Sequence, residues 1–174
     1  RSSDLDKGDI IDYLSMVAPV PFNKGFIFSD QIHEELKKHG QSIDEYVIYV
    51  NNNQIFKAYT TSIYKGENGG KKRIDDINQL QDFTIYGTDG ELLSWGWYGI
   101  SNFTQVIPGV NLARGFRLRK GNIQIGSDTC LMKLFKEDRG TYYFFGEVNT
   151  IHKDLIPNAR RDYFLRSEEH TSEL

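Results

Sequence analysis

The feature that most constrains this chain is a hydrophobic strand that runs directly into a turn with two adjacent arginines. Residues Thr141–Val148 are aromatic and β-branched, which is typical of a buried strand. Pro157 and Asn158 then break the pattern and favour a turn. We therefore expect Arg160 and Arg161 on a loop that a rigid sheet holds, a position in which loops often carry function.

Short aromatic and β-branched runs alternate with turn residues along the rest of the chain. The runs expected to be strands are Tyr46–Val50, Gln54–Tyr59, Asp82–Tyr86, Glu91–Ile100, Arg117–Lys120 and Asn122–Ile125. The segments expected to be helices are one that begins at about Asp9 and ends before Pro19, Asp30–Lys38 capped by Ser29, and the short run Cys130–Lys136. This order predicts an α+β fold, a two-layer sandwich with helices packed on one face of a mainly antiparallel sheet.

Composition excludes several classes of protein. The 174 residues can bury one sizeable core. No apolar run approaches the roughly 20 residues that span a bilayer, and no signal-peptide pattern is present, so we expect a cytoplasmic protein with no membrane partner. A single cysteine, Cys130, excludes an internal disulfide and a multi-cysteine zinc site. The small net charge of −3 argues against a general polyanion-binding surface.

The strand that begins near Gly115 is expected to be basic on one side. Alternation places Phe116 and Leu118 inward and Arg117 and Arg119 outward. With neighbouring Arg114, the outward side chains form either a solvated face or a contact surface for nucleotide, for an acidic partner or for a nucleic-acid backbone.

Three other motifs favour a structural interpretation. The glycine-rich run Gly66–Lys72 is one residue short of a P-loop and lacks its hydroxyl, so we interpret it as a flexible hairpin loop. The polar, glycine-rich stretch Tyr64–Arg73 around it is expected to be a mobile loop. Trp95–Tyr98 can stack on bases, but such aromatic residues more often form a core. The run His33–Lys37 begins like the zinc-binding motif of zinc proteases, in which two histidines stand one helical turn apart. Lys37 stands where the second histidine is required.

Two runs of this sequence resemble the ninety-kilodalton heat-shock chaperone. Lys153–Asp162, K-D-L-I-P-N-A-R-R-D, resembles the segment D-L-P-L-N-x-S-R-E of that family, which also follows a hydrophobic strand. Phe116–Gly126 resembles the basic strand pair that precedes this segment in the chaperone's middle domain, and order and spacing agree across Gly115–Phe164. The family belongs to the GHKL superfamily, in which a separate N-terminal domain binds ATP.

The resemblance implies roles for three residues. In the chaperone the arginine of this segment reaches the terminal phosphate of the nucleotide, and residue by residue it falls on Arg161. The family's asparagine falls on Asn158, and Arg160 replaces a serine. Arg161 and Arg160 are therefore the candidate catalytic residues, and Asn158 and Arg161 the candidate nucleotide-binding residues. ATP and Mg²⁺ would bind the intact protein and not this chain alone, which would not hydrolyse ATP by itself.

The resemblance also predicts how the chain is divided and what it contacts. We expect residues 1–28 to be the tail of an upstream ATP-binding domain with a connector, 29–165 to be the middle or transducer domain, and 166–174 to be a non-native tail that looks like a translated sequencing adapter. The expected partners are the upstream domain, a client protein and a second copy in a homodimer. The competing interpretation is a nucleic-acid-binding module of a gyrase-like or MutL-like protein that contacts DNA.

Overall fold

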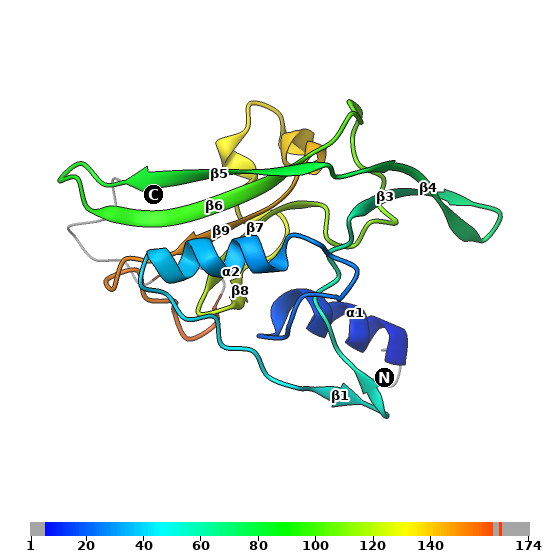
Figure 1. Cartoon of the computed structure of the whole chain (residues 1–174), viewed down its shortest axis with the longest axis horizontal. Coiled ribbons are helices and arrows are strands. Elements are labelled where there is room, and N and C mark those ends of the chain that lie inside the picture. Colours follow the sequence, from blue (N-terminus) through cyan, green and yellow to red (C-terminus); the bar gives the residue numbers. More distant parts are fainter. Residues whose placement is uncertain (1–5, 162–163, 165–174) are drawn as a thin grey trace.

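The computed structural model describes residues 6–161 and residue 164. Its centre is one sheet made of β5 (Gln79–Tyr86), β6 (Leu92–Ile100), β7 (Gly115–Lys120), β8 (Ile123–Ile125) and β9 (Phe145–Thr150). The five strands lie in the order β5-β6-β9-β7-β8 (Figure 1). All neighbours in this sheet are antiparallel except β7 and β9, which are parallel. The last strand of the described residues, β9, therefore lies in the middle of the sheet.

Two small hairpins lie outside this sheet. They are β1 (Tyr49–Val50) with β2 (Asn53–Gln54), and β3 (Ser62–Glu67) with β4 (Gly70–Asp76). Positive φ angles at both central residues explain the turns, Asn51 and Asn52 in the first hairpin and Asn68 and Gly69 in the second. The hairpin expected over Gly66–Lys72 is present. The expectation of a mobile loop over the whole of Tyr64–Arg73 is wrong, because most of that run forms the paired strands β3 and β4.

The helices follow local signals in the sequence. In α1 (Lys7–Val17), the side chain of Asp6 accepts a hydrogen bond from the Gly8 N–H and caps the first turn. The second helix, α2 (Ser29–Lys38), has an acidic first turn and a basic last turn, and Gly40 follows it with a φ of 74°. Neither helix of the described segment is long and apolar enough to cross a membrane.

The segment before β9 differs in part from the expectation. A 3₁₀ turn over Met132–Leu134 stands where a short helix was expected, and a second 3₁₀ segment covers Asp138–Tyr143. Strand β9 therefore begins at Phe145, four residues later than the aromatic run suggests. Phe135 and Phe144 of this segment still pack inward, against the face of the sheet that α1 and α2 leave uncovered.

Both faces of the central sheet carry a buried core. On one face, Ile32 and Leu36 of α2 pack with Trp95 and Trp97 of β6. The core on the other face is made of Leu93, Phe116, Leu118, Ile125, Val148, Leu155 and Phe164. The predicted α+β class and two-layer architecture are confirmed, and the two tryptophans are core residues rather than a stacking platform.

The expected outward position of Arg117 and Arg119 is wrong. Both side chains are buried, and Arg119 is 0% exposed. The alternation itself is correct, since Phe116 and Leu118 lie on the opposite face. The face of β7 that carries the two arginines is covered by α1. There Arg119 donates a hydrogen bond to the carbonyl of Met16, at the end of that helix (2.7 Å).

Candidate functional site

The two adjacent arginines lie in a turn that the body of the protein holds in place. The N–H of Arg161 donates to the carbonyl of Asn158 (3.0 Å), which closes the turn. The carbonyl of Arg161 accepts a hydrogen bond from the N–H of Gly126 (2.7 Å), just after β8. Leu155 and Phe164 on either side of the turn are buried in the second core. The predicted turn is therefore present and is anchored to the sheet.

An open cavity of about 880 Å³ lies next to this turn, and Arg160 and Arg161 line it. Arg114 and Arg117 line the same cavity, so arginines from two distant parts of the chain contribute to its wall. The acidic side chains in the lining are those of Asp12 and Asp128. The cavity is consequently richer in positive than in negative charge. We refer to it below as the arginine cavity.

Arg117 places a buried positive charge at the wall of the arginine cavity. Its Nη2 donates to the carbonyls of Leu112 (2.7 Å) and Arg114 (2.9 Å), and its Nη1 donates to Gln124 (3.5 Å). Within residues 6–161, its Nε is a buried donor without a hydrogen-bond partner. Burial lowers the pKa of Arg117 from its ordinary value. A buried cation with an unused donor favours an anion in the adjacent space.

Arg114 is held in a fixed orientation at the same wall. Its guanidinium stacks on the ring of Tyr142, 4.0 Å from the centroid, and its Nη1 donates to the carbonyl of Ile107 (3.0 Å). The hydroxyl of Tyr142 donates to the carboxylate of Asp128 (3.1 Å). Arg114 therefore reaches the cavity as part of an ordered group of side chains.

Arg160 and Arg161 differ from these two, because both side chains are exposed. Among the described residues neither forms an ion pair, so no salt bridge from these arginines to Asp154 closes the turn. Asp162, the other acidic residue next to the turn, lies outside the described residues. Asn158 is half-buried and supplies the carbonyl of the turn, and it is not in the lining of the cavity. The two arginines therefore line the cavity, whereas Asn158 lies outside its lining.

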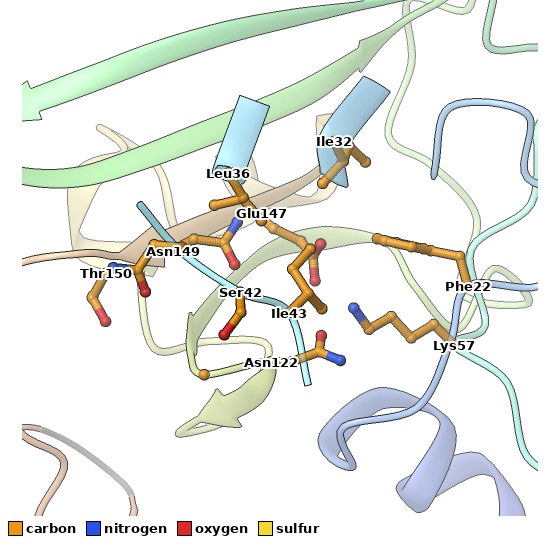
Figure 2. A pocket seen from close by; sticks show the side chains of 12 residues that line it. Phe22, Ile32, Leu36, Ser42, Ile43, Lys57, Asn122, Glu147, Asn149 and Thr150 are labelled. Atoms are coloured by element: carbon orange, nitrogen blue, oxygen red, sulfur yellow. The ribbon is translucent and has the colours of Figure 1, made fainter. Parts of the chain in front are cut away.

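A second cluster, which was not among the predicted sites, lies beneath α2 (Figure 2). The side chain of Lys57 is 2% exposed, and its ammonium lies 4.0 Å from the centre of the Phe22 ring. Burial is the largest cause of a pKa for Lys57 lowered to about 7. Figure 2 shows this side chain reaching toward the space between Ile43, Asn122 and Glu147.

The rest of this cluster is an ion pair with satisfied hydrogen bonds. The carboxylate of Glu147 accepts from Trp97 Nε1 (3.2 Å) and from Arg119 Nε. Arg119 also donates to the carbonyl of Asn122 (3.3 Å). The cavity beside Lys57 measures about 20 Å³, enough for about one water molecule. We therefore regard the cluster as part of the core and the arginine cavity as the candidate functional site.

A signal for the second cluster is present in the sequence. Lys57 falls in phase with Ile55 and Tyr59, and all three side chains are buried on the same side of an extended segment. Glu147 is a similar case, because it is a buried charged residue next to the buried Val148 in a hydrophobic strand. A single charged residue in such a run indicates a buried charge that has a partner elsewhere in the chain.

Comparison with protein-family models, with curated proteins and with solved structures finds no match to this chain. No group of three or more metal-binding side chains gathers in the part of the chain that the structure describes. What the arginine cavity can bind follows from its chemistry. Guanidinium groups present a planar fork of donors that matches the oxygen atoms of phosphate and carboxylate groups.

Proposed function

We propose that this chain is the middle, or transducer, domain of an ATP-binding protein similar to the ninety-kilodalton heat-shock chaperone. In this proposal a neighbouring domain binds ATP and Mg²⁺, and Arg161, with Arg160 beside it, senses the terminal phosphate. The chain then couples ATP binding and hydrolysis to a conformational change that acts on a client protein. The intact protein is a cytoplasmic homodimer in this proposal.

The observation that carries the proposal is the position of Arg160 and Arg161. Both are exposed and free of ion pairs with described residues, and both line the arginine cavity next to the buried charge of Arg117. A terminal phosphate brings the negative oxygens that such an arrangement lacks. Because the guanidinium groups are already positioned, they stabilise charge that develops on the phosphate without reorganisation of the site.

The backbone around Arg161 supports a role that requires accurate placement. The hydrogen bond from Gly126 fixes the Arg161 carbonyl to the end of β8, so a displacement of this turn also moves the sheet. Helix α1 lines the cavity through Asp12 and Tyr13. In our proposal α1 belongs to the connection with the ATP-binding domain, so both sides of the cavity respond to the nucleotide.

Steady-state ATP hydrolysis tests the proposal in the protein that joins this chain to its ATP-binding domain. We expect Arg161→Ala to lower kcat by about 10³-fold or more, as loss of an arginine finger does, while nucleotide affinity is retained. Arg160→Ala measured beside it shows which of the two arginines acts on the phosphate. The control is Arg139→Ala, which removes an exposed arginine that pairs with Glu137 and does not line the cavity.

The proposal fails if Arg161→Ala and Arg160→Ala both hydrolyse ATP at the rate of the wild type. It also fails if all three variants, including the control Arg139→Ala, lose nucleotide binding and turnover. The effect then reflects a general loss of positive charge. A loss of turnover in Arg161→Ala, alone or together with Arg160→Ala, supports the proposal when nucleotide binding is retained and Arg139→Ala keeps the wild-type rate.

A further inference from the structure

The hairpin β3–β4 is an exposed basic arm. It projects beyond the end of the central sheet, at the right of the view in Figure 1, and it pairs with no other strand of the described structure. From Ser62 to Asp76 it carries four basic and three acidic side chains. Asp75 and Asp76 lie at its base, so the part between Tyr64 and Arg73 carries four basic side chains and one acidic side chain. The four basic residues, all exposed, are Lys65, Lys71, Lys72 and Arg73.

The register of the hairpin brings like charges together. Lys65 lies directly opposite Lys72 across the two strands, and no ion pair neutralises either of them among the described residues. Directly opposed like charges destabilise a strand pair. On the other side of the ribbon, Lys71 Nζ lies 4.5 Å from the centre of the Tyr64 ring. Both sides of the arm therefore present cations to solvent.

The arm is fixed at its base rather than loosely attached. The N–H of Tyr64 donates to the side-chain oxygen of Asn111 (2.9 Å), and Asn111 Nδ2 donates back to the Tyr64 carbonyl (2.7 Å). Ile63 is 1% exposed and lies in the core. At the tip, Asn68 and Gly69 have the positive φ angles of a tight two-residue turn. Its cations are consequently presented in a defined arrangement.

We propose that the β3–β4 hairpin binds the phosphodiester backbone of a nucleic-acid duplex. A two-stranded ribbon fits the major groove, which is about 12 Å wide, and there its two sides face the two phosphate strands. The arm has no large apolar side chain in an exposed position, which argues against a membrane anchor or an apolar protein interface. No residue of the arm lines the arginine cavity, so this inference is independent of the nucleotide proposal.

Binding of the 174-residue chain to a labelled DNA duplex of arbitrary sequence, measured by fluorescence anisotropy between 50 and 200 mM NaCl, tests the inference. Arg73 forms an ion pair with Asp76 of the same hairpin (2.7 Å), so the expected phosphate contacts are those of the three lysines. If all three contact phosphates, log K falls against log salt with a slope of about −2.7. We expect the double variant Lys65→Gln/Lys72→Gln to weaken binding and to reduce the steepness of this slope by about 1.8.

The matched control is Lys37→Gln/Lys136→Gln, which removes the same charge from exposed positions outside the arm. It is expected to keep the affinity and the slope of the wild type. Thermal unfolding of each variant shows that it is folded, and relief of the Lys65–Lys72 repulsion is expected to leave the melting temperature of the arm variant unchanged or slightly higher.

Three results overturn the inference. The first is that the wild type does not bind the duplex at 50 mM NaCl. The second is that the arm variant and the control variant weaken binding equally. The third is that the arm variant keeps duplex binding but loses binding to vesicles that contain phosphatidylserine. The second result indicates general electrostatic attraction, and the third indicates a membrane surface as the partner.

Discussion

Arg119 and Glu147 form an ion pair that is sealed from solvent, with side-chain exposures of 0% and 2%. The two residues lie on the neighbouring strands β7 and β9. The remaining donors of Arg119 reach the carbonyl of Met16 at the end of α1 and the carbonyl of Asn122 in the turn before β8. One buried guanidinium therefore connects a helix, a turn and the central strand.

Loss of one member of this pair is expected to be far more harmful than loss of both. Arg119→Met leaves the Glu147 carboxylate buried without its cation, and we expect it to lower the free energy of unfolding by about 3–5 kcal/mol. The double variant Arg119→Met/Glu147→Met is expected to recover most of that loss, because neither charge of the pair remains to be buried. Urea unfolding of the two variants and the wild type at pH 7 measures both effects. A double variant as unstable as the single variant contradicts this account.

Lys57 is expected to make stability depend on pH. Its pKa is about 7 in the folded protein and near its ordinary value of 10.5 in the unfolded chain. At pH values between these two, the unfolded state binds more protons than the folded state, so the free energy of unfolding rises with pH from about 7 upward. Below pH 7 Lys57 is protonated in both states, and the cost of burying its charge is present in full. Over that range the change is on the order of a few kcal/mol.

The measurement compares urea unfolding at about pH 7 and about pH 9 for the wild type, Lys57→Met and Lys37→Met. Lys57→Met is expected to remove the rise, and Lys37→Met to keep it, because Lys37 is exposed. If the wild type and Lys57→Met show the same pH dependence, Lys57 does not titrate in this range.

The left-handed backbone of Arg161, with a φ of 55°, predicts opposite effects of two similar substitutions. Arg161→Gly relieves the strained conformation, whereas Arg161→Ala keeps it, and both remove the guanidinium. We expect the glycine variant to be more stable than the alanine variant by about 1 kcal/mol in chemical denaturation. Equal stability of the two variants would show that the turn relaxes to another conformation.

Gly146 of β9 is expected to tolerate no side chain. A Cβ at this position would lie 2.6 Å from the ring of Phe116 and 2.6 Å from the carbonyl oxygen of Trp97. Gly146→Ala therefore forces the packed core to shift, at a cost of about 1–3 kcal/mol or more. Gly66→Ala is the control, since a Cβ there meets nothing within 4 Å, and it is expected to stay within about 0.5 kcal/mol of the wild type. Thermal unfolding of both variants tests this difference.

The parts of the fold that depend on neighbouring residues were predictable from the sequence. Helix α2 follows from Ile32 and Leu36, which stand one turn apart, and from charges that suit its two ends. The turn with Arg160 and Arg161 follows from Pro157 and the asparagine after it. These signals act over a few residues, so they do not depend on the rest of the fold.

The parts that depend on distant contacts were not predictable. Alternation showed that Arg117 and Arg119 share one face of β7, but not that α1, about a hundred residues earlier in the chain, covers that face. For the same reason the sequence did not bring Arg117 to the cavity of Arg161, or Lys57 to Glu147. The phosphate role of Arg161 stays a prediction.

The position of β9 has a consequence for synthesis on the ribosome. This strand is the last of the sheet to be translated, yet it lies between β6 and β7 and pairs with both. Until residues 145–150 emerge, a nascent chain holds two separate pieces, β5–β6 and β7–β8, each with an open edge. During that time Arg119 lacks Glu147, its ion-pair partner in the folded protein. Completion of the domain is therefore a late, single event, and the nascent chain is most vulnerable to aggregation immediately before it.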